Sequence, residues 1–528
     1  MPNADPPDFR SNTIVLQHLR RHYYPSDEVS QSSRAVIDEY DESLALSDTE
    51  FAASMKTRQD IVKKLKNAQS LLAHIRMLPI EILGEIFYRV AYIPDMDALV
   101  KERQECRQRP ISDYMPLVLQ RVCRLWHDVT ISTSKLYTQL FFPCMIFDDD
   151  NLPSPSILIP IWLQRSQTLP MEAYLYLKPD EYQSISSLLS RSISRMTRLS
   201  IAIDTLFLNS LFPPNTRTEL PLLRNFSFLG FHENPDTVQM GVIVADSLVK
   251  FTTAFHDGWQ RFIQFGNHLS HFNSSYGIMH ISTLVKLLST CPSLETVRVI
   301  YSEADYTDTI PPNIIDLPNL TKFSLKWGDE TRGLRQIMQR LKTPNLRSLS
   351  MQAGPAGEEI SLIPDISSWI QVSKVDLRRL SLGGVYYHPP TEELSTLLKL
   401  TPSLDEIWLS WALDEDDLAL LNRYTNPHIC PSLVKMTFDF AIVPIQAFLY
   451  MISSRAMDLT PVEPRIFFKK LETLVARKVY GMERADGMDL NQRGNAYEEI
   501  NDAIAHMAHK HPGLRVNING ILHYIPLR

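Results

Sequence analysis

Three histidines near the C-terminus, His506, His509 and His511, come closest to a cluster of metal ligands in this chain. The first two would share one face of a helix, a placement that metal ligands can use. No cysteine or carboxylate completes the set, however, and Pro512 follows directly. We therefore interpret these histidines as a solvated helix end, and the sequence predicts no metal site.

Motifs for covalent catalysis or phosphate binding are equally scarce. Ser132 and Lys135 formally match Ser-x-x-Lys, but the companion motifs are absent and the pair reads as the end of a helix. No Gly-x-Ser-x-Gly, no Walker-type loop and no Gly-x-Gly-x-x-Gly following a strand is present. Only 17 glycines in 528 residues leave little for phosphate cradles. The sequence predicts a non-catalytic protein without cofactors.

Two acidic runs favour structural interpretations. The spacing within Asp148–Asp150 matches no calcium loop, so this run reads as a solvated, Pro-rich joint. The run Asp414–Asp417 precedes apolar residues and reads as the acidic first turn of a helix, where negative charge is stabilising.

Net charge and cysteine content indicate which partners and which cellular compartment to expect. A formal net charge of −7 and a pI near 6.1 argue against sequence-independent nucleic-acid binding, which needs a basic face. The five cysteines are odd in number and far apart, as expected for reduced thiols in the cytoplasm and/or nucleus. The longest apolar run, Phe440–Ile452, is too short to span a bilayer, so no membrane association is expected.

A short amphipathic helix is predicted to begin at Pro79 and to continue to about Val90. Proline is favoured in the first helical turn, where its missing N–H costs nothing. At helical spacing the apolar residues share one arc of about 140°, and they are Ile82, Leu83, Ile86, Phe87 and Val90. Because so short a helix is unstable alone in water, this arc must be buried against the same domain or a partner.

A second apolar segment, Pro116–Ser134, a little further along the chain, predicts a second short amphipathic helix. Its apolar side chains recur at helical spacing, and they are Val118, Leu119, Val122, Leu125, Trp126 and Val129. Two short amphipathic helices in succession indicate a small all-helical module.

Residues 77–140 resemble an F-box, in the variant abundant in basidiomycete fungi. The resemblance lies in Leu78-Pro79-x-Glu81-Ile82-Leu83-x-x-Ile86-Phe87, followed by Val122-Cys123-Arg124-x-Trp126 and Ser132-Thr133-x-x-Leu136. One departure is Leu136-Tyr137, where the family usually has Leu-Trp. A plain buried helix pair remains the alternative interpretation.

The resemblance implies a partner and a division of labour within the module. F-boxes dock onto the Skp adaptor and, through it, join cullin and RING subunits. Carried over by motif, the adaptor-binding residues are Leu78, Pro79, Ile82, Leu83 and Ile86. The residues that pack the module are Phe87, Val122, Cys123 and Trp126.

Composition predicts the remaining boundaries. Residues 1–45 are rich in Pro, Ser and Asp and read as a flexible segment, whereas 46–75 lack Pro and Gly and read as one helix. The helical module is assigned to 76–140 and a Pro-rich linker to 141–160. Residues 161–528 then form the last and largest domain.

That last domain contains an internal repeat, Leu-x-x-Φ-x-Φ, where Φ is apolar. Strong copies begin at Leu223, Leu294, Leu320, Leu346, Leu377, Leu404, Leu433 and Leu471, and weaker ones at Met196, Leu248 and Leu269. Successive copies are 21 to 38 residues apart, a range centred on leucine-rich-repeat length. Several copies are preceded by Pro two residues before the Leu, at Pro292, Pro318, Pro344, Pro402 and Pro431.

The repeat predicts an α/β fold in which a small all-helical module precedes an irregular solenoid. Each unit ends in a strand with one face inward, and segments such as 281–289 and 392–399 are amphipathic helices. Stacked units would place parallel strands on the concave face and helices on the convex face. This resembles the leucine-rich-repeat domains that follow many F-boxes, although the consensus Asn after the strand is nearly absent. A doubly wound α/β domain remains the alternative.

Alternation along each predicted strand identifies residues that would face outward and could bind a target protein. They are Arg298, Lys322, Arg379, Trp408 and Lys435, together with Ser324 and Arg347. Trp408 lies between inward Ile407 and Leu409, and large aromatic side chains are frequent binding anchors. Packing of Trp408 on Trp411 or a neighbouring strand is the competing interpretation.

These observations give two hypotheses of function. In the first, the chain is the substrate-recognition subunit of an SCF-type cullin-RING ubiquitin ligase in ubiquitin-dependent degradation. In the second, it is a non-ligase interaction scaffold whose repeat domain works alone. An undetected enzyme is a distant third, and the sequence names no target.

Overall fold

The computed structural model describes residues 27–49, 61–66, 69, 74–92, 115–143, 155–176, 182–201, 205–228, 239–253, 259–301, 313–328, 331–354, 361–384, 389–411, 413–439, 442–443, 445–456, 471–477, 480–481, 509, 514–518 and 521–523. The chain divides into two compact units, Met1–Thr197 and Arg198–Arg528.

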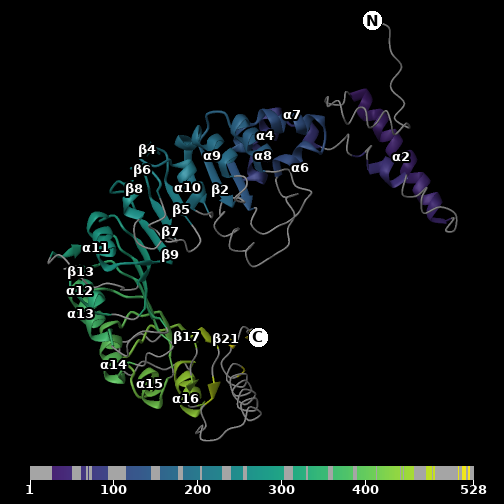
Figure 1. The fold of residues 1–528 in the computed structure, drawn as a ribbon. Helices are drawn as coiled ribbons and strands as arrows, with labels where there is room; N and C mark the ends of the chain where they lie inside the picture. Colours follow the sequence, from purple (N-terminus) through teal and green to yellow (C-terminus); the bar gives the residue numbers. More distant parts are fainter. Residues whose placement is uncertain are drawn as a thin grey trace, which may run out of the picture. The chain divides into compact units, whose positions relative to one another are not determined.

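The first unit is mostly helical. Its elements are α2 (Asp27–Thr49), η1 (His74–Met77), α4 (Ile80–Ala91), α6 (Met115–Gln120), α7 (Arg124–Ser132), η3 (Ser134–Tyr137), β1 (Gln139–Pro143), α8 (Pro155–Arg165), β2 (Met171–Tyr176), α9 (Tyr182–Ser190) and η5 (Ile193–Arg195) (Figure 1). Strands β1 and β2 pair in parallel, with Leu140 opposite Ala173. The helical module and the first parallel strands therefore belong to one unit.

The prediction of a flexible segment through residue 45 is wrong over α2. Ser and Asp favour turns and loops, but no Pro or Gly interrupts the chain between Pro25 and Pro79, and the helix begins with Asp27 and Glu28 in its first turn. Most of the helix predicted for 46–75 lies outside the described residues.

The second unit is built from parallel strands and helices in alternation. Its elements are β3 (Met196–Ile201), α10 (Thr205–Leu211), β4 (Arg217–Glu219), β5 (Asn225–Phe228), β6 (Val242–Ala245), β7 (Lys250–Thr253), η7 (Trp259–Arg261), β8 (Ile263–Phe265), β9 (His271–Met279), α11 (Ile281–Thr290), β10 (Thr296–Tyr301), β11 (Ile315–Asp316), β12 (Lys322–Trp327), α12 (Arg332–Met338), β13 (Leu341–Lys342), β14 (Ser348–Ala353), α13 (Ile363–Ser373), β15 (Arg379–Gly383), α14 (Thr391–Leu400), β16 (Glu406–Ser410), α15 (Glu415–Leu421), β17 (Lys435–Asp439), β18 (Ile442–Val443), α16 (Ile445–Ala456), β19 (Thr473–Arg477), β20 (Tyr480–Gly481), β21 (Arg515–Ile518) and β22 (Ile521–His523).

Strand order decides between the two architectures that the sequence left open. In the second unit the main sheet runs β3-β5-β7-β9-β10-β12-β14-β15-β16-β17-β19-β21-β22, and every pair is parallel except β21 with β22. Strands therefore add in sequence order without the reversal that a doubly wound sheet requires. Helices α11 to α16 form a row along one face of this sheet (Figure 1). The solenoid prediction is confirmed.

The predicted repeat corresponds to the strands. Every unit predicted from Met196 to Leu471 is a strand of the main sheet, and the leading Leu of each strong copy is fully buried. The sequence missed the last unit, where Leu514 is buried and precedes β21. Burial alternates along the strands, so apolar residues such as Phe323 and Leu325 in β12 face the helices and their neighbours face away.

The recurrent prolines act through turn geometry. In each of five units the N–H of the leading Leu donates to the carbonyl three residues earlier, as in Leu294 to Cys291 at 3.2 Å. The others join Leu320 to Leu317, Leu346 to Thr343, Leu404 to Thr401 and Leu433 to Cys430. The proline occupies the second position of each four-residue turn, where its fixed φ is favourable.

A fully buried arginine supports the core near the end of the solenoid. Arg455 of α16 donates to the backbone carbonyls of Leu421 at 2.7 Å, Cys430 at 2.7 Å and Ile429 at 2.9 Å. The first of these carbonyls ends α15, and the other two belong to the connection between α15 and β17. Burial lowers the pKa of Arg455 to about 10, so the guanidinium stays charged at neutral pH. One side chain thus hydrogen-bonds three buried carbonyls, of which that of Cys430 also accepts from the Leu433 N–H.

Candidate interaction surfaces

Helix α4 buries only part of the apolar arc predicted from its sequence. Leu83 and Phe87 are buried, and the Phe87 ring lies 4.7 Å from the Trp126 ring, centroid to centroid. A Cβ at Gly84 would lie 2.9 Å from Thr133 Oγ1, so the absence of a side chain there allows close approach. These contacts hold α4 against α7 and η3.

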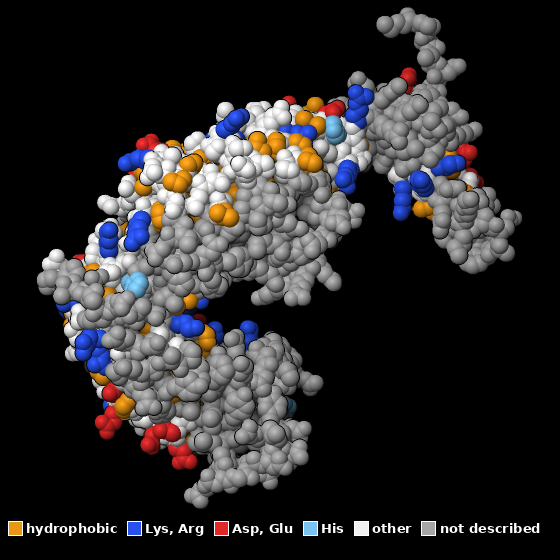
Figure 2. All heavy atoms as spheres, viewed as in Figure 1, with side chains coloured by type: hydrophobic (Ala, Val, Ile, Leu, Met, Phe, Trp, Pro, Cys, Tyr) orange, Lys and Arg blue, Asp and Glu red, His pale blue; other side chains and the backbone are white. Residues whose placement is uncertain are grey.

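The other half of the arc faces outward. Ile82 and Val90 are 49% and 53% exposed, and Ile86, half-buried, lies between them at i+4. We use the name apolar stripe of the first unit for these residues together with further exposed apolar residues of η1, α4, α6 and the turn after α6: Met77, Ile80, Ile82, Ile86, Val90, Val118 and Val122. Figure 2 shows hydrophobic side chains gathered near α4, α6 and α8. Exposed apolar groups at this density mark interaction sites more often than isolated ones do.

Two predicted site residues differ in burial from what their assigned roles imply. Leu83, predicted to face a partner, is fully buried, because its position on the helix points between Gly84 and Phe87 toward α7. Val122, predicted to pack the module, is 53% exposed, because the helix breaks there into a turn before α7. Pro79 is exposed, and Leu78, Cys123 and Trp126 are half-buried.

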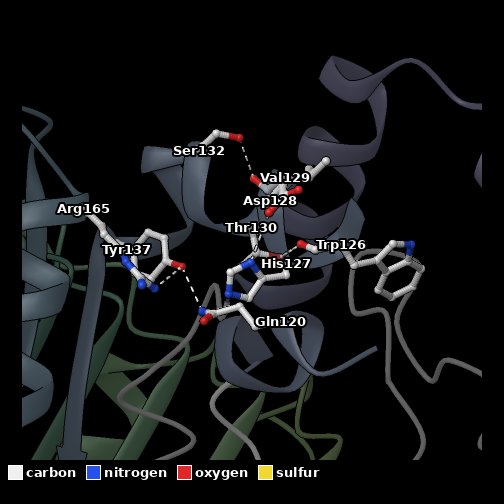
Figure 3. Close-up of polar contacts among 9 residues, drawn as sticks. All are labelled: Gln120, Trp126, His127, Asp128, Val129, Thr130, Ser132, Tyr137 and Arg165. Carbon is white, nitrogen blue, oxygen red and sulfur yellow. Dashed lines mark hydrogen bonds and ion pairs between the residues drawn. The ribbon is translucent and has the colours of Figure 1, made fainter. Parts of the chain in front are cut away.

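A polar cluster joins α6 to α8 through Tyr137. Its hydroxyl accepts hydrogen bonds from Gln120 Nε2 at 3.0 Å and from Arg165 Nη1 at 2.9 Å. The Arg165 guanidinium also lies 5.1 Å from the Tyr137 ring centroid. Figure 3 shows Gln120 and Arg165 approaching the hydroxyl from two sides. Burial raises the pKa of Tyr137, so the phenol remains neutral and able to donate as well as accept.

Tyr137 also packs on Trp162 of α8, with ring centroids 5.3 Å apart in an edge-to-face arrangement. The indole of Trp162 donates to the Gln139 carbonyl at 3.1 Å. Tyr137 therefore uses both its ring and its hydroxyl in these contacts. Within the first unit, helical module and first strands are joined by both apolar and polar contacts.

In the second unit, the residues predicted for target binding lie on the strand face, which is the face of the main sheet opposite the helices. Arg298, Lys322 and Arg379 are exposed, and Lys435 and Trp408 are half-buried. Register pairs Lys322 with Ser348, Ser348 with Arg379, Arg379 with Glu406, and Glu406 with Lys435. Lys322, Arg379 and Lys435 thus belong to one row across the sheet.

A second row on the strand face is dominated by hydroxyl groups. From β10 to β17 the register gives, in order, Arg298, Ser324, Ser350, Ser381, Trp408 and Thr437. Trp408 therefore stands between Ser381 and Thr437, and its indole N–H is buried without a hydrogen-bond partner. The indole is the one large apolar group on this stretch of the row.

Ion pairs join neighbouring residues of the first row, the one that contains Lys322, Arg379 and Lys435. Glu406 contacts Arg379 Nε at 3.5 Å and Lys435 Nζ at 3.5 Å. Sequence reasoning missed Lys326, exposed on β12 four residues after Lys322, although the same alternation identifies it. It also missed the exposed apolar residues outside α4, because a turn such as 121–122 leaves no periodic signal.

The acidic run at α15 has the predicted structural role. Asp414 caps the helix by accepting a hydrogen bond from the Asp417 N–H at 2.8 Å. Asp417 is itself buried and accepts from Trp411 Nε1 at 3.4 Å and Thr391 Oγ1 at 3.2 Å. Trp411 is therefore engaged with α15.

The residues that the structure describes contain neither a candidate metal site nor a helix that could span a membrane. Among these residues, no group of three or more His, Cys, Asp or Glu residues is placed to hold a metal ion. Of the three C-terminal histidines only His509 is described, and Asp148–Asp150 lie outside those ranges. Among the helices described, none is long and apolar enough to cross a membrane. Cys123, Cys291 and Cys430 are thiols.

Comparison with known proteins adds little to this picture. No protein-family model and no curated protein matches the chain. Among solved structures, the crystal structure of a TLR13–ssRNA13 complex is similar over 59% of this chain and 48% of that chain, at 15% identity and a TM-score of 0.28. The match thus spans about half of that chain, and the score is too low to establish a common fold.

The strand order, the register and the repeated turn define the class of the second unit. It is an irregular leucine-rich-repeat-like solenoid, and it follows a small helical module. Its exposed strand face makes it a protein-interaction repeat domain by architecture.

Proposed function

We propose that this chain is the substrate-recognition subunit of an SCF-type cullin-RING ubiquitin ligase. The helical module would dock onto the Skp adaptor, and the solenoid would hold a target protein. The observation that carries the proposal is the apolar stripe of the first unit, which α4 leaves exposed although its other half is buried. The F-box resemblance of residues 77–140 supplies the identity of the partner.

In this mechanism the chain performs no covalent chemistry. It would hold the target near a ubiquitin-charged enzyme bound elsewhere in the assembly, which raises the local concentration of target lysines. The Tyr137 cluster supports such a role, because it joins the docking helices to the first strands through hydrogen bonds from Gln120 and Arg165.

A non-ligase scaffold is the second candidate function. The strand face of the solenoid is exposed in its own right, so the repeat domain could bind a partner without any adaptor. Co-assembly with a cullin distinguishes the two functions, because a scaffold would bind no cullin.

The test is co-expression with the Skp adaptor followed by affinity capture of the native chain and of Ile82→Asp. Ile82 is half exposed, so the substitution leaves the fold intact while placing a charge in the stripe. Loss of one central apolar anchor typically costs about 2 kcal/mol or more, roughly a thirtyfold loss of affinity. Val372→Asp is the matched control, since Val372 is equally apolar and exposed on α13.

Capture by the native chain and by Val372→Asp, but not by Ile82→Asp, would support the proposal. Cullin in the captured complex would favour the ligase over the scaffold. If the native chain captures no adaptor, the ligase proposal fails and the stripe must serve another partner.

A further inference from the structure

Basic residues recur at a fixed interval across the strand face of the solenoid. In the row that opens each strand, β12, β15, β17 and β21 contribute Lys322, Arg379, Lys435 and Arg515. The strands between them, β14, β16 and β19, contribute Ser348, Glu406 and Thr473. A cationic side chain therefore appears on every second strand.

The sign of this charge is unusual for the chain as a whole. The protein carries a formal net charge of −7, yet Glu406 is the single acidic residue among the outward-facing strand positions that the structure describes from Thr296 of β10 to Thr437 of β17. Acidic residues instead gather on the helix side, over α14 and α15 (Figure 2), at Glu392, Glu393, Glu415 and Asp416. The described outward positions of these strands are therefore mainly basic or neutral.

Strand spacing converts the interval into a length. Adjacent strands lie about 4.8 Å apart, so cations on every second strand recur at about 9.6 Å. A polyproline II helix rises about 3.1 Å per residue with three residues per turn, so side chains at i, i+3, i+6 and i+9 share one face at about 9.3 Å intervals. The two intervals agree closely.

We propose that the strand face from β12 to β21 binds an acidic segment of a partner protein, extended as a polyproline II helix with Asp or Glu at every third position. The segment would cross the strands, with successive carboxylates above Lys322, Arg379, Lys435 and Arg515. Its remaining residues would lie over the hydroxyl row and Trp408, which offers the flat apolar surface that such helices use. This inference rests on the proposed protein-binding function and specifies the chemistry of the target.

Glu406 has a definite place in this arrangement. It bridges Arg379 and Lys435 at 3.5 Å each and so occupies those cations in the unbound protein. A carboxylate arriving from a partner must compete with it. Replacement of Glu406 by a neutral residue is therefore expected to strengthen binding, an effect opposite in sign to that of removing a lysine.

The test uses fluorescein-labelled ten-residue peptides and the full-length chain, with binding followed by fluorescence anisotropy at 50 mM salt. The probe peptide carries Glu at the first, fourth, seventh and tenth positions and Pro elsewhere. One control peptide has the same composition with the four Glu residues adjacent, and a second has Gln for Glu. A single-stranded oligonucleotide tests for general polyanion binding.

We expect the periodic peptide to bind roughly three- to thirtyfold tighter than the clustered peptide, because clustering removes two or more ion pairs. Lys322→Gln/Lys435→Gln is expected to weaken binding by a similar factor, and Glu406→Gln to tighten it about two- to fivefold. Lys286→Gln is the matched control: Lys286 is exposed on α11, on the helix side, and its loss should change nothing.

Equal affinity for the periodic and clustered peptides, or no effect of the double variant, would overturn the proposal. Tighter binding of the oligonucleotide with the same variant dependence would replace the acidic peptide by nucleic acid and equally overturn it. Adaptor capture is scored on the same protein. Capture without peptide binding refutes this inference alone, whereas peptide binding without capture refutes the ligase function and leaves the inference standing.

Discussion

The two candidate surfaces of this protein are made in opposite ways. The apolar stripe of the first unit consists largely of residues of α4, a helix whose apolar arc exceeds what its own module buries: Ile82 is exposed, whereas the next residue, Leu83, is buried. The strand face of the second unit consists of alternate residues whose neighbours are all buried, as in β12, where Lys322 and Ser324 flank buried Phe323. The first surface exists because the module leaves apolar side chains exposed, and the second because the core of the solenoid buries the apolar side chains on the other face of strands such as β12.

This difference predicts different binding behaviour. Association through the stripe removes apolar area from water, which is largely independent of salt. Association through the strand face depends on charges near water, which salt screens over a Debye length of about 10 Å at 0.1 M. Charge complementarity at the strand face also raises the rate of encounter with an oppositely charged partner more than it raises the affinity of the final complex.

The largest effect is expected from the buried half of α4. Phe87→Ala removes a ring that contacts Trp126 and leaves a cavity, so unfolding free energy should fall by about 3 to 5 kcal/mol. Ile82→Ala, one turn away and half exposed, should lower it by about 1 kcal/mol or less. Thermal and urea unfolding of the two variants provides the measurement. Similar losses of stability in both would mean that the stripe is part of the core.

In the second unit the corresponding contrast is between Arg455 and Lys322. Arg455→Met removes the guanidinium that donates to the buried carbonyls of Leu421 and Ile429, whereas the Cys430 carbonyl keeps its bond from the Leu433 N–H, and the loss should cost about 3 kcal/mol or more. Lys322→Met changes an exposed side chain and should cost about 0.5 kcal/mol or less. Urea unfolding of both variants measures this. A small effect of Arg455→Met would show that water or a neighbouring group replaces the guanidinium.

Salt should separate the two surfaces directly. Between 50 and 500 mM NaCl, binding of the periodic acidic peptide to the strand face is expected to weaken about tenfold, while capture of the adaptor through the stripe changes about twofold or less. Anisotropy titration and quantitative capture at each salt concentration give the comparison. Loss of both interactions at high salt would indicate that charge, rather than apolar burial, drives docking at the first unit.

Trp408 gives a smaller and more local test of the strand face. Truncation of this half-buried indole in Trp408→Ala removes contact area beneath the proposed segment and should weaken peptide binding several-fold, with adaptor capture unchanged. Unchanged peptide affinity would mean that Trp408 only packs between Ser381 and Thr437.

The repeat architecture was predictable because each repeat carries its own short sequence pattern. Each unit carries its own Leu, its own alternation and often its own turn proline, so errors in one unit do not affect the others, and even the weak copies at Leu248 and Leu269 proved to be strands. The order of the strands in the sheet then followed, because consecutive repeats of a solenoid stack next to one another. The sequence analysis missed the unit of β21, because its apolar residues follow Leu514 at two-residue spacing and so do not match Leu-x-x-Φ-x-Φ.

The surface residues were less predictable, for a physical reason. Periodicity identifies the centre of an apolar arc but not how much of it the module can cover, so Leu83 and Val122 were assigned to the wrong sides. Register across strands is also invisible in one sequence, and the alignment of Lys322 with Arg379 and Lys435 emerges only when the sheet is assembled. Helix α2 was missed because composition was weighed above the absence of Pro and Gly.

Two thiols allow the least perturbing test of the same contrast. Cys123 is half-buried beside the exposed Val122, whereas Cys430 lies in the core of the second unit, where burial raises its pKa from 9.0 to about 11. The thiolate is the reactive form, so at pH 8 Cys123 should be alkylated by iodoacetamide well before Cys430. Bound adaptor should protect Cys123 and leave Cys430 unaffected, as mass spectrometry of the labelled peptides would show.

The shifted pKa of Cys430 also predicts a pH dependence of stability with a definite sign. Between pH 9.0 and about pH 11 the unfolded chain loses this thiol proton while the folded chain keeps it. The contribution to the free energy of unfolding is therefore complete below pH 9 and is lost as pH rises through this window, by roughly 2 to 3 kcal/mol at most. Cys430→Ala should flatten this part of the urea-unfolding profile, and an unchanged slope would show that the thiol ionises as readily in the folded chain as in the unfolded one.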